Sequence, residues 1–259
     1  MSPILPKFRN YEIEKLSNSY KKAVTIVPNF TFPFYGQPLK NVTVATGGFI
    51  FVGGTLHSQL TATQYIAPLM AGFDTWLSNS SFVQYFTNET HFVVQWLNMR
   101  LQNQSTIGSF SFQATLHKNG EIAFVYKNVP IPPAAISTEQ HPVKLGISDA
   151  YVTYSKVFFL NRKKIYEYHR IMLNQDLISN LTAAILTPRK LCNTVNDCNS
   201  CLTAVTSFAC KWCESVKRCS DGFDRNREQW LNSNCDKQEN FSCNGVENKD
   251  NTTIIAQQN

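Results

Sequence analysis

Apolar residues alternate with smaller or polar ones along much of the chain, and this period of two predicts β-strands. Phe30, Phe32 and Phe34 alternate in this way in the first clear strand. In the next strand Asn41 and Thr43 lie opposite two valines, so we expect their face to point to solvent and to carry a glycan. Further strands are predicted at 49–52, 91–96, 109–116, 121–126, 143–147, 151–159 and 165–172.

The strands at 109–116 and 121–126 predict a hairpin whose register depends on its turn. A two-residue turn at 119–120 would set the apolar stripes of the two strands on opposite faces. A three-residue loop at 118–120, with Gly120 left-handed as a bulge, brings the stripes onto one face. We therefore predict the bulged turn, which pairs Leu116 with Ile122, Ala114 with Phe124 and Phe112 with Tyr126.

All eight cysteines fall between Cys192 and Cys243, and this asymmetry divides the chain. A stretch of about fifty residues buries too little apolar surface to fold securely alone, so it needs disulfides or a metal. The longer region before it can build its own core. We predict a lead-in segment at 1–27, a β-rich domain at 28–173, a linker at 174–190, a small cysteine-rich domain at 191–244 and a tail at 245–259.

Two Cys-x-x-Cys pairs, Cys198 with Cys201 and Cys210 with Cys213, raise the alternative of a zinc site, because paired thiolates at this spacing suit a tetrahedral ion. Disulfides are the preferred interpretation, since a four-cysteine zinc site would leave the other four thiols unexplained. No metal and no other cofactor is therefore expected. Spacing alone does not choose among the roughly one hundred possible pairings of eight cysteines.

The glycosylation sequons indicate the cellular compartment in which the chain folds. Eight Asn-x-Ser/Thr sequons accompany the even number of cysteines, a combination typical of the oxidising secretory route. The sequence shows neither a signal peptide nor an apolar run of about 18 residues, so we expect an ectodomain fragment, or the product of a gene model that lacks its first and last exons. The predicted glycan acceptors are Asn29, Asn41, Asn79, Asn88, Asn103, Asn180, Asn240 and Asn251.

Charge and motifs argue against nucleic-acid binding and catalysis. The net charge of +6 is modest, and the one basic triplet, 162–164, is interpreted as a solvated loop, so no nucleic-acid partner is expected. Five histidines are scattered without a catalytic motif, and we predict no enzymatic activity and no catalytic residue. His169 stands in the most polar cluster and is interpreted as structural. Asp74 alone supplies too few carboxylates for a calcium site.

The cysteine spacing resembles that of a known module. Cys192-x5-Cys198-x2-Cys201, followed by Cys210-Lys-Trp-Cys213, is similar to the plexin–semaphorin–integrin (PSI) module. The resemblance implies a rigid wedge that orients neighbouring domains, with Trp212 packed against its bridges. It also implies four disulfides, Cys192–Cys210, Cys198–Cys243, Cys201–Cys219 and Cys213–Cys235.

A wider resemblance covers roughly residues 10–243. Five separated strings, 61–71, 108–115, 141–144, 165–170 and 218–225, resemble in order the plexin domain-containing proteins, also called the tumour endothelial marker 7 family. This resemblance implies that the β-rich region is similar to a nidogen-type (NIDO) domain. It also implies a parent that is a single-pass type I membrane protein.

Two hypotheses about function follow from these resemblances. In the first, the chain is the extracellular binding region of a cell-surface receptor, in which the β-rich domain binds a protein ligand and the PSI module orients it. For some relatives the resemblance implies a secreted anti-angiogenic serpin-type factor as that ligand. In the second, the chain is a secreted or matrix-linking adhesion glycoprotein, or a soluble decoy form, that holds matrix glycoproteins. Membrane attachment is expected only through a segment missing from this chain, and secretion if the chain is complete.

Overall fold

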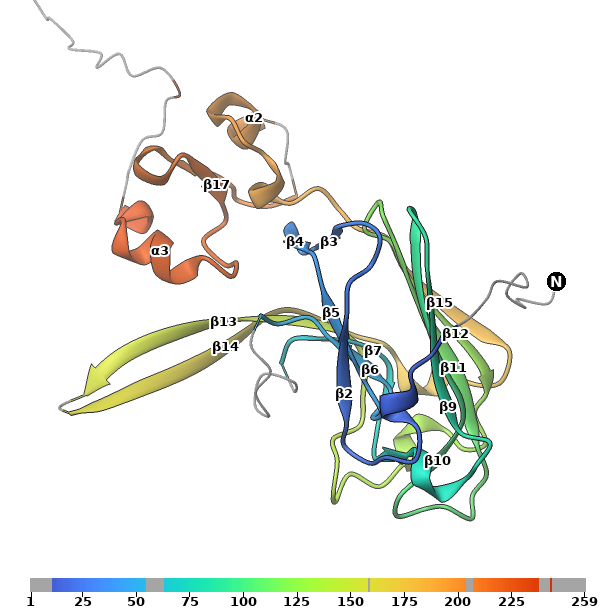
Figure 1. Ribbon diagram of the computed structural model, residues 1–259. Helices are drawn as coiled ribbons and strands as arrows, with labels where there is room; N and C mark the ends of the chain where they lie inside the picture. The colour runs from blue at the N-terminus through green and yellow to red at the C-terminus, as the bar shows by residue number, and fades with distance from the viewer. Residues whose placement is uncertain (1–10, 55–62, 158, 204–206, 238–242, 244–259) are drawn as a thin grey trace, which may run out of the picture.

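The structure is a computed structural model that describes residues 11–54, 63–157, 159–203, 207–237 and 243 of the chain. Among these residues, the strands form two large antiparallel sheets that face each other, followed by a small module stapled by disulfides (Figure 1). The prediction of a mainly β chain with a disulfide-rich C-terminal part is confirmed.

The first sheet contains seven strands within the described part of the chain. Its order is β1-β9-β10-β11-β12-β15, and β8 pairs with the end of β10. Their bounds are β1 (Tyr11–Glu12), β8 (Phe73–Asp74), β9 (Phe82–Thr87), β10 (His91–Leu101), β11 (Phe110–His117), β12 (Ile122–Asn128) and β15 (Thr182–Leu186).

The second sheet contains six described strands in the order β14-β13-β7-β6-β5-β2. A separate short hairpin, β3 with β4, lies beside the two sheets (Figure 1). The bounds are β2 (Ala23–Ile26), β3 (Phe32–Phe34), β4 (Gln37–Leu39), β5 (Val42–Ala45), β6 (Phe49–Phe51), β7 (Tyr65–Met70), β13 (Lys144–Val157) and β14 (Leu160–Met172). Short 3-10 turns connect these strands: η1 (Glu14–Leu16), η2 (Thr75–Leu77), η3 (Pro133–Ala135) and η4 (Gln175–Leu177).

The main hydrophobic core takes side chains from both sheets. Two buried aromatic residues of the first sheet also make polar contacts with the second. The Trp96 indole N–H donates to the Ala45 carbonyl at 2.8 Å, and the Tyr126 hydroxyl donates to the Pro68 carbonyl at 2.7 Å. Both rings are fully buried, so these bonds satisfy polar groups that have no access to water and fix one sheet on the other.

The hairpin of β11 and β12 has the predicted register. Leu116 pairs with Ile122, Ala114 with Phe124 and Phe112 with Tyr126, and all six side chains are buried in the main core. The Gly120 amide donates to the His117 carbonyl at 2.8 Å, and Gly120 has a φ of 92°. The three-residue bulged loop is thus confirmed, because a left-handed residue closes it as expected.

Three predictions from the sequence are wrong in detail. Thr43 is 8% exposed rather than open to solvent, because β5 lies inside the sheet and the Thr43 hydroxyl meets that of Thr25 at 2.9 Å. The separate strands predicted at 143–147 and 151–159 are one strand, β13, with a register shift between Ile147 and Asp149. The basic triplet, predicted to be a loop, belongs to β14, although its side chains are exposed.

The structure also places strands where the sequence analysis predicted a lead-in segment and a linker. β2 pairs with β5, and β15 pairs with β12. Both are short edge strands without a fully buried residue, and in β15 apolar residues occupy exposed as well as partly buried positions, so neither strand shows a clear alternation of apolar and polar residues. The domain boundaries themselves stay predictions.

The cysteine-rich module, residues 192–243, contains short elements around four disulfides. The bridges are Cys192–Cys210, Cys198–Cys243, Cys201–Cys219 and Cys213–Cys235, the same pairs that the resemblance implies. Trp212 packs among the first and third bridges, and Trp230 packs against the fourth. The elements are η5 (Cys192–Thr194), α2 (Cys198–Thr203), β16 (Lys211–Cys213), η6 (Glu214–Val216), β17 (Arg218–Ser220), α3 (Arg227–Asn232) and η7 (Cys235–Lys237).

Candidate functional site

The cysteine-rich module meets the β domain through a buried ion pair. Arg225, between β17 and α3, reaches Asp149 on β13, where its Nε donates to Oδ2 at 2.8 Å and its Nη2 to Oδ1 at 2.9 Å. The same Nη2 donates to the Val52 carbonyl at 2.9 Å. The Asp149 side chain is 0% exposed and that of Arg225 is 18% exposed. A two-point contact of this kind fixes the angle between its partners as well as their distance.

Two more donors satisfy the Asp149 carboxylate. The Tyr168 hydroxyl on β14 donates to Oδ2 at 2.6 Å, and the Gln64 amide donates to Oδ1 at 3.2 Å. Gln64 also donates to the Ala150 carbonyl at 3.0 Å, which holds its amide in place. A buried carboxylate is tolerated only when it is paired and hydrogen-bonded, and this one has both kinds of partner.

The tyrosines around this contact stay protonated. Burial raises the pKa of Tyr168, and the negative charge of Asp149 raises it further. Burial and Asp149 also raise the pKa of Tyr35, and burial with the charge of Glu167 raises that of Tyr65 to about 12. At physiological pH these phenols are therefore hydrogen-bond donors and not bases.

A second contact surrounds His169, which the sequence analysis interpreted as structural. A register shift sets two residues of β14 opposite Ser148, and His169 has a left-handed φ of 47° there. Its ring stacks on Tyr35, with centroids 5.7 Å apart, and lies edge-on to Phe208 of the module at 6.0 Å. Its Nε2 lies 3.5 Å from Oδ2 of Asp221. The bulge therefore directs an aromatic side chain of the sheet toward the module.

Asp221 and Asn193 strengthen this second contact from the module side. Burial opposes ionisation of Asp221, but its bonds to His169 and to the Phe223 amide outweigh burial and lower its pKa. The Asn193 amide donates to the Tyr35 carbonyl at 2.9 Å. Gly36 follows Tyr35 with a φ of 75°, and a Cβ there would lie 2.1 Å from Asn193 Oδ1. Only glycine fits so close to the module.

A groove of ≈ 640 Å³ opens beside this junction. Its walls come from the β3–β4 hairpin, the ends of β12, β14 and β15, the segment 187–191, and Phe208 of the module. That volume is within the roughly 300–1,000 Å³ of most ligand sites, and the joint between two parts of a protein is a common place for one. Arg170, Arg189 and Lys190 contribute the charge, and none of the described residues that line the groove is acidic.

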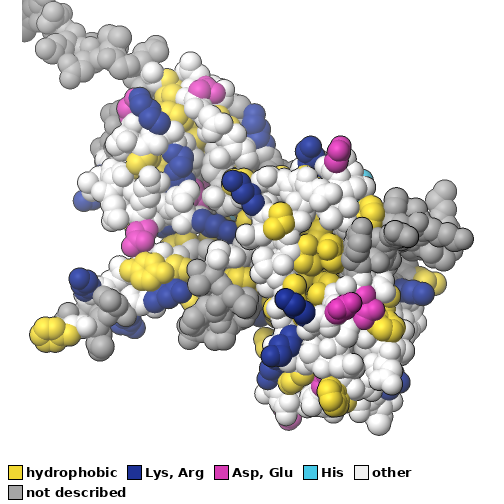
Figure 2. Space-filling model, viewed as in Figure 1, with side chains coloured by type: hydrophobic (Ala, Val, Ile, Leu, Met, Phe, Trp, Pro, Cys, Tyr) yellow, Lys and Arg dark blue, Asp and Glu magenta, His cyan; other side chains and the backbone are white. Residues whose placement is uncertain are grey.

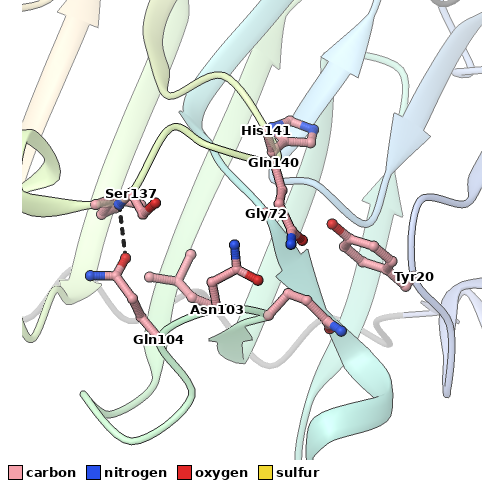
Figure 3. Close-up of a pocket in the computed structure, with 10 residues that line it drawn as sticks. Tyr20, Gly72, Asn103, Gln104, Ser137, Gln140 and His141 are labelled. Atoms are coloured by element: carbon pink, nitrogen blue, oxygen red, sulfur yellow. Dashed lines mark hydrogen bonds between the residues drawn. The ribbon is translucent and has the colours of Figure 1, made fainter.

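A second hollow lies at the other end of the sheets and is too small for a ligand. Figure 3 shows the residues that line it, among them Tyr20, Gly72, Asn103 and His141. Its volume is ≈ 10 Å³, about that of one water. The Gln104 side chain accepts a hydrogen bond from the Ser137 amide at 2.8 Å at one side of the hollow (Figure 3). Asp74, the residue weighed as a calcium ligand, is 4% exposed and accepts from the Trp76 amide at 2.8 Å, so it caps η2.

The predicted glycan acceptors are spread over the surface rather than gathered at one site. Asn29, Asn41, Asn79, Asn103 and Asn180 are exposed, and Asn88 is partly buried with its side-chain oxygen bonded to the His91 amide at 2.7 Å. Asn240 and Asn251 lie outside the described residues. Glycosylation at these positions stays a prediction.

Within the described ranges, no group of three or more His, Cys, Asp or Glu residues could hold a metal ion. In the same part of the chain, no helix is long and apolar enough to cross a membrane. Sequence reasoning singled out neither Arg225 nor Asp149 as contact residues. Arg225 ends one of the five strings that resemble the plexin domain-containing proteins, 218–225. Its contact with Asp149, however, joins residues 76 positions apart, and no local sequence pattern predicts such a contact.

One comparison with known proteins found a match. A family model described as NIDO related matches residues 10–168, which extend from the start of the described chain into β14. No solved structure matches the chain. The matched domains are of a non-catalytic, adhesion type, and together with the four disulfides they indicate an extracellular protein.

Proposed function

The chain belongs to the NIDO-related family, and from that premise we propose that it is the ligand-binding extracellular region of a cell-surface receptor. In this proposal the β domain binds a protein ligand, and the cysteine-rich module acts as a PSI-type wedge that sets its orientation. The observation that carries the proposal is the junction itself. The bidentate contact of Arg225 with buried Asp149 holds the module at one angle, as an orienting wedge requires.

The groove beside the junction is the proposed place of the ligand. An extended acidic segment of a protein is its best occupant, because the lining combines apolar surface with Arg170, Arg189 and Lys190 and no described carboxylate. Arg170 also contacts Glu167 at 3.3 Å, so Arg189 and Lys190 carry most of the proposed recognition. A serpin-type factor or a matrix glycoprotein is the proposed class of partner.

Direct binding measurements with the tagged chain test this proposal. Immobilised chain is exposed to a library of purified secreted and cell-surface proteins, and each retained protein is then titrated against two charge-reversed variants. We expect Arg189→Glu/Lys190→Glu to weaken binding at least tenfold. Arg162→Glu/Lys163→Glu makes the same charge change at the end of β14 that does not line the groove, and should leave binding unchanged. A ligand bound equally well by the groove variant would contradict the proposed site.

The location of the parent protein separates the receptor from its alternative. Surface biotinylation of cells that express the full-length gene product should label it and leave it in the membrane fraction. Recovery in the matrix or the medium would instead support a matrix-linking or decoy form. Treatment with a glycosidase should shift the mass of the secreted chain, since five predicted acceptors are exposed.

A further inference from the structure

The hairpin of β13 and β14 extends beyond the body of the protein as an arm (Figure 1). β13 pairs with β7 only through Ser148, whereas its pairing with β14 continues to Val157 and Leu160. We call the described residues of this outer part, 153–157 and 159–164, the arm. On one side it meets the module, where the Tyr154 amide donates to Glu228 of α3 at 3.4 Å. The outer part of the arm leads away from both sheets (Figure 1).

The charge of the arm has one sign. Between Ala150 and Tyr166 the sequence contains four basic residues and no acidic one. The four are Lys156, Arg162, Lys163 and Lys164, and all are exposed. In a body that otherwise mixes both signs, this concentration of positive charge predicts an anionic partner.

The strand register sets these cations on both faces of the arm. Lys163 is paired with Tyr154, so it shares a face with Lys156 two residues further along β13. Arg162 and Lys164 alternate with Lys163 along β14 and therefore point to the opposite face. Each face thus presents two cations. A polyanionic chain lying along one face would reach only half of them.

Two aromatic side chains of the arm are open to solvent. The Phe159 side chain is 104% exposed, and the Tyr154 side chain is 63% exposed. Figure 2 shows hydrophobic side chains at the outer end of the arm with basic side chains beside them. Transfer of the large apolar Phe159 side chain from water into an apolar environment would lower the free energy, and none of the described residues buries it.

We propose that the arm binds anionic lipid surfaces by inserting Phe159 between the headgroups. Inserted tip first, the arm would have headgroups on both of its faces, so the cations of both faces would contact phosphates and carboxylates at once. The long stems of the lysines and of Arg162 allow their charges to stay at headgroup level while the tip goes deeper. Tyr154 lies further from the tip, at the level of the membrane–water interface. Its apolar ring and its polar hydroxyl suit that mixed environment.

This proposal adds a membrane contact to the proposed function and does not depend on it. The groove and the arm use different cations, so each serves as the control for the other. Arg189 and Lys190 line the groove and lie outside the arm.

Vesicle flotation with the purified chain tests the proposal. We expect the chain to float with vesicles in which about a third of the lipid is phosphatidylserine, and not with phosphatidylcholine alone. Arg162→Ser/Lys163→Ser should lower the partition coefficient about thirty-fold, at roughly 1 kcal/mol for each cation near such a surface. The charge-matched control Arg189→Ser/Lys190→Ser should float like the wild type.

Two variants at the tip separate insertion from simple attraction of charges. Phe159→Ser should weaken partitioning about tenfold without changing thermal stability, because the side chain it removes is fully exposed. Phe159→Trp should give a blue shift of tryptophan emission when phosphatidylserine vesicles are added. Equal flotation of Phe159→Ser and wild type, or no emission shift, would overturn the proposal.

Binding to heparin supplies the competing outcome. The arm would be a polysaccharide site if the chain is retained on a heparin column and does not float with vesicles. In that case retention would depend on Arg162 and Lys163 and would be unchanged in Phe159→Ser. That result would also overturn the proposal. If the groove control Arg189→Ser/Lys190→Ser loses flotation as much as Arg162→Ser/Lys163→Ser does, binding depends on net charge alone. The arm would then not be the lipid-binding site.

Discussion

At the residue scale, Asp149 is the position where the two parts of the chain depend most on a single side chain. Its carboxylate is fully buried and receives bonds from Arg225, Tyr168 and Gln64. Nothing near Asp149 in the sequence predicts this, because its partners come from distant positions and converge only when the second sheet and the module have formed. His169 is a similar case, since a left-handed histidine at a bulge has no local sequence signal.

Removing the arginine should be costly. Arg225→Ala leaves the Asp149 charge buried and without its cation, and we expect a loss of about 3–5 kcal/mol in the free energy of unfolding. Urea denaturation followed by tryptophan fluorescence measures it. The control is Arg170→Ala, whose pair with Glu167 is largely exposed and should cost no more than about 1 kcal/mol. Similar small losses in both variants would refute a structural role for the buried pair.

His117 should make stability depend on pH. Burial lowers its pKa, the facing His91 lowers it further, and Glu121 only partly opposes them. Because the pKa is lower in the folded state, the folded chain binds fewer protons, so this contribution is complete above the unfolded pKa of about 6.5 and is lost as the pH falls below it. The melting temperature should fall less for His117→Gln than for wild type between about pH 7.5 and pH 5.5. An identical pH dependence of the two proteins would contradict this.

At the element scale, local pattern and turn chemistry predicted the strands whose two faces differ. The hairpin of β11 and β12 follows from alternation together with the requirements of a glycine turn. The sequence pattern did not predict β7, because all six of its residues are buried. One face of β7 packs in the main core and the other in a second cluster, so apolar and polar residues do not alternate. The pattern did not predict β15 for the opposite reason. It is a short edge strand with no fully buried residue, and the apolar Ile185 is exposed.

The hairpin register has a direct energetic consequence. Phe124 is fully buried in the main core opposite Ala114, so Phe124→Ala should cost about 3–5 kcal/mol through the lost contacts and the cavity. Val125→Ala changes the next residue, which faces the other way and is only partly buried, and should cost much less. Chemical denaturation of both variants measures the difference. A larger loss at Val125 would mean that the register is shifted by one residue.

At the scale of the whole molecule, the cysteine distribution correctly separated a sheet-built region from one built on disulfides. What it could not predict is that the module packs against the β domain. The Cys198–Cys243 bridge spans 45 residues, the longest separation of the four. The double variant Cys198→Ser/Cys243→Ser should therefore cost roughly 2–5 kcal/mol and reduce secretion. Unchanged secretion and unchanged resistance of the module to protease would show that this bridge is dispensable.

The module and the β domain should move as one body, because Arg225 is held by Asp149. Nuclear relaxation of backbone amides in the labelled chain tests it most directly, by comparing the rotational correlation time of residues 211–237 with that of β10, β11 and β12. We predict one common value in the wild type and a shorter value for the module in Arg225→Ala. A wild-type module that already tumbles faster than the sheets would contradict the claim.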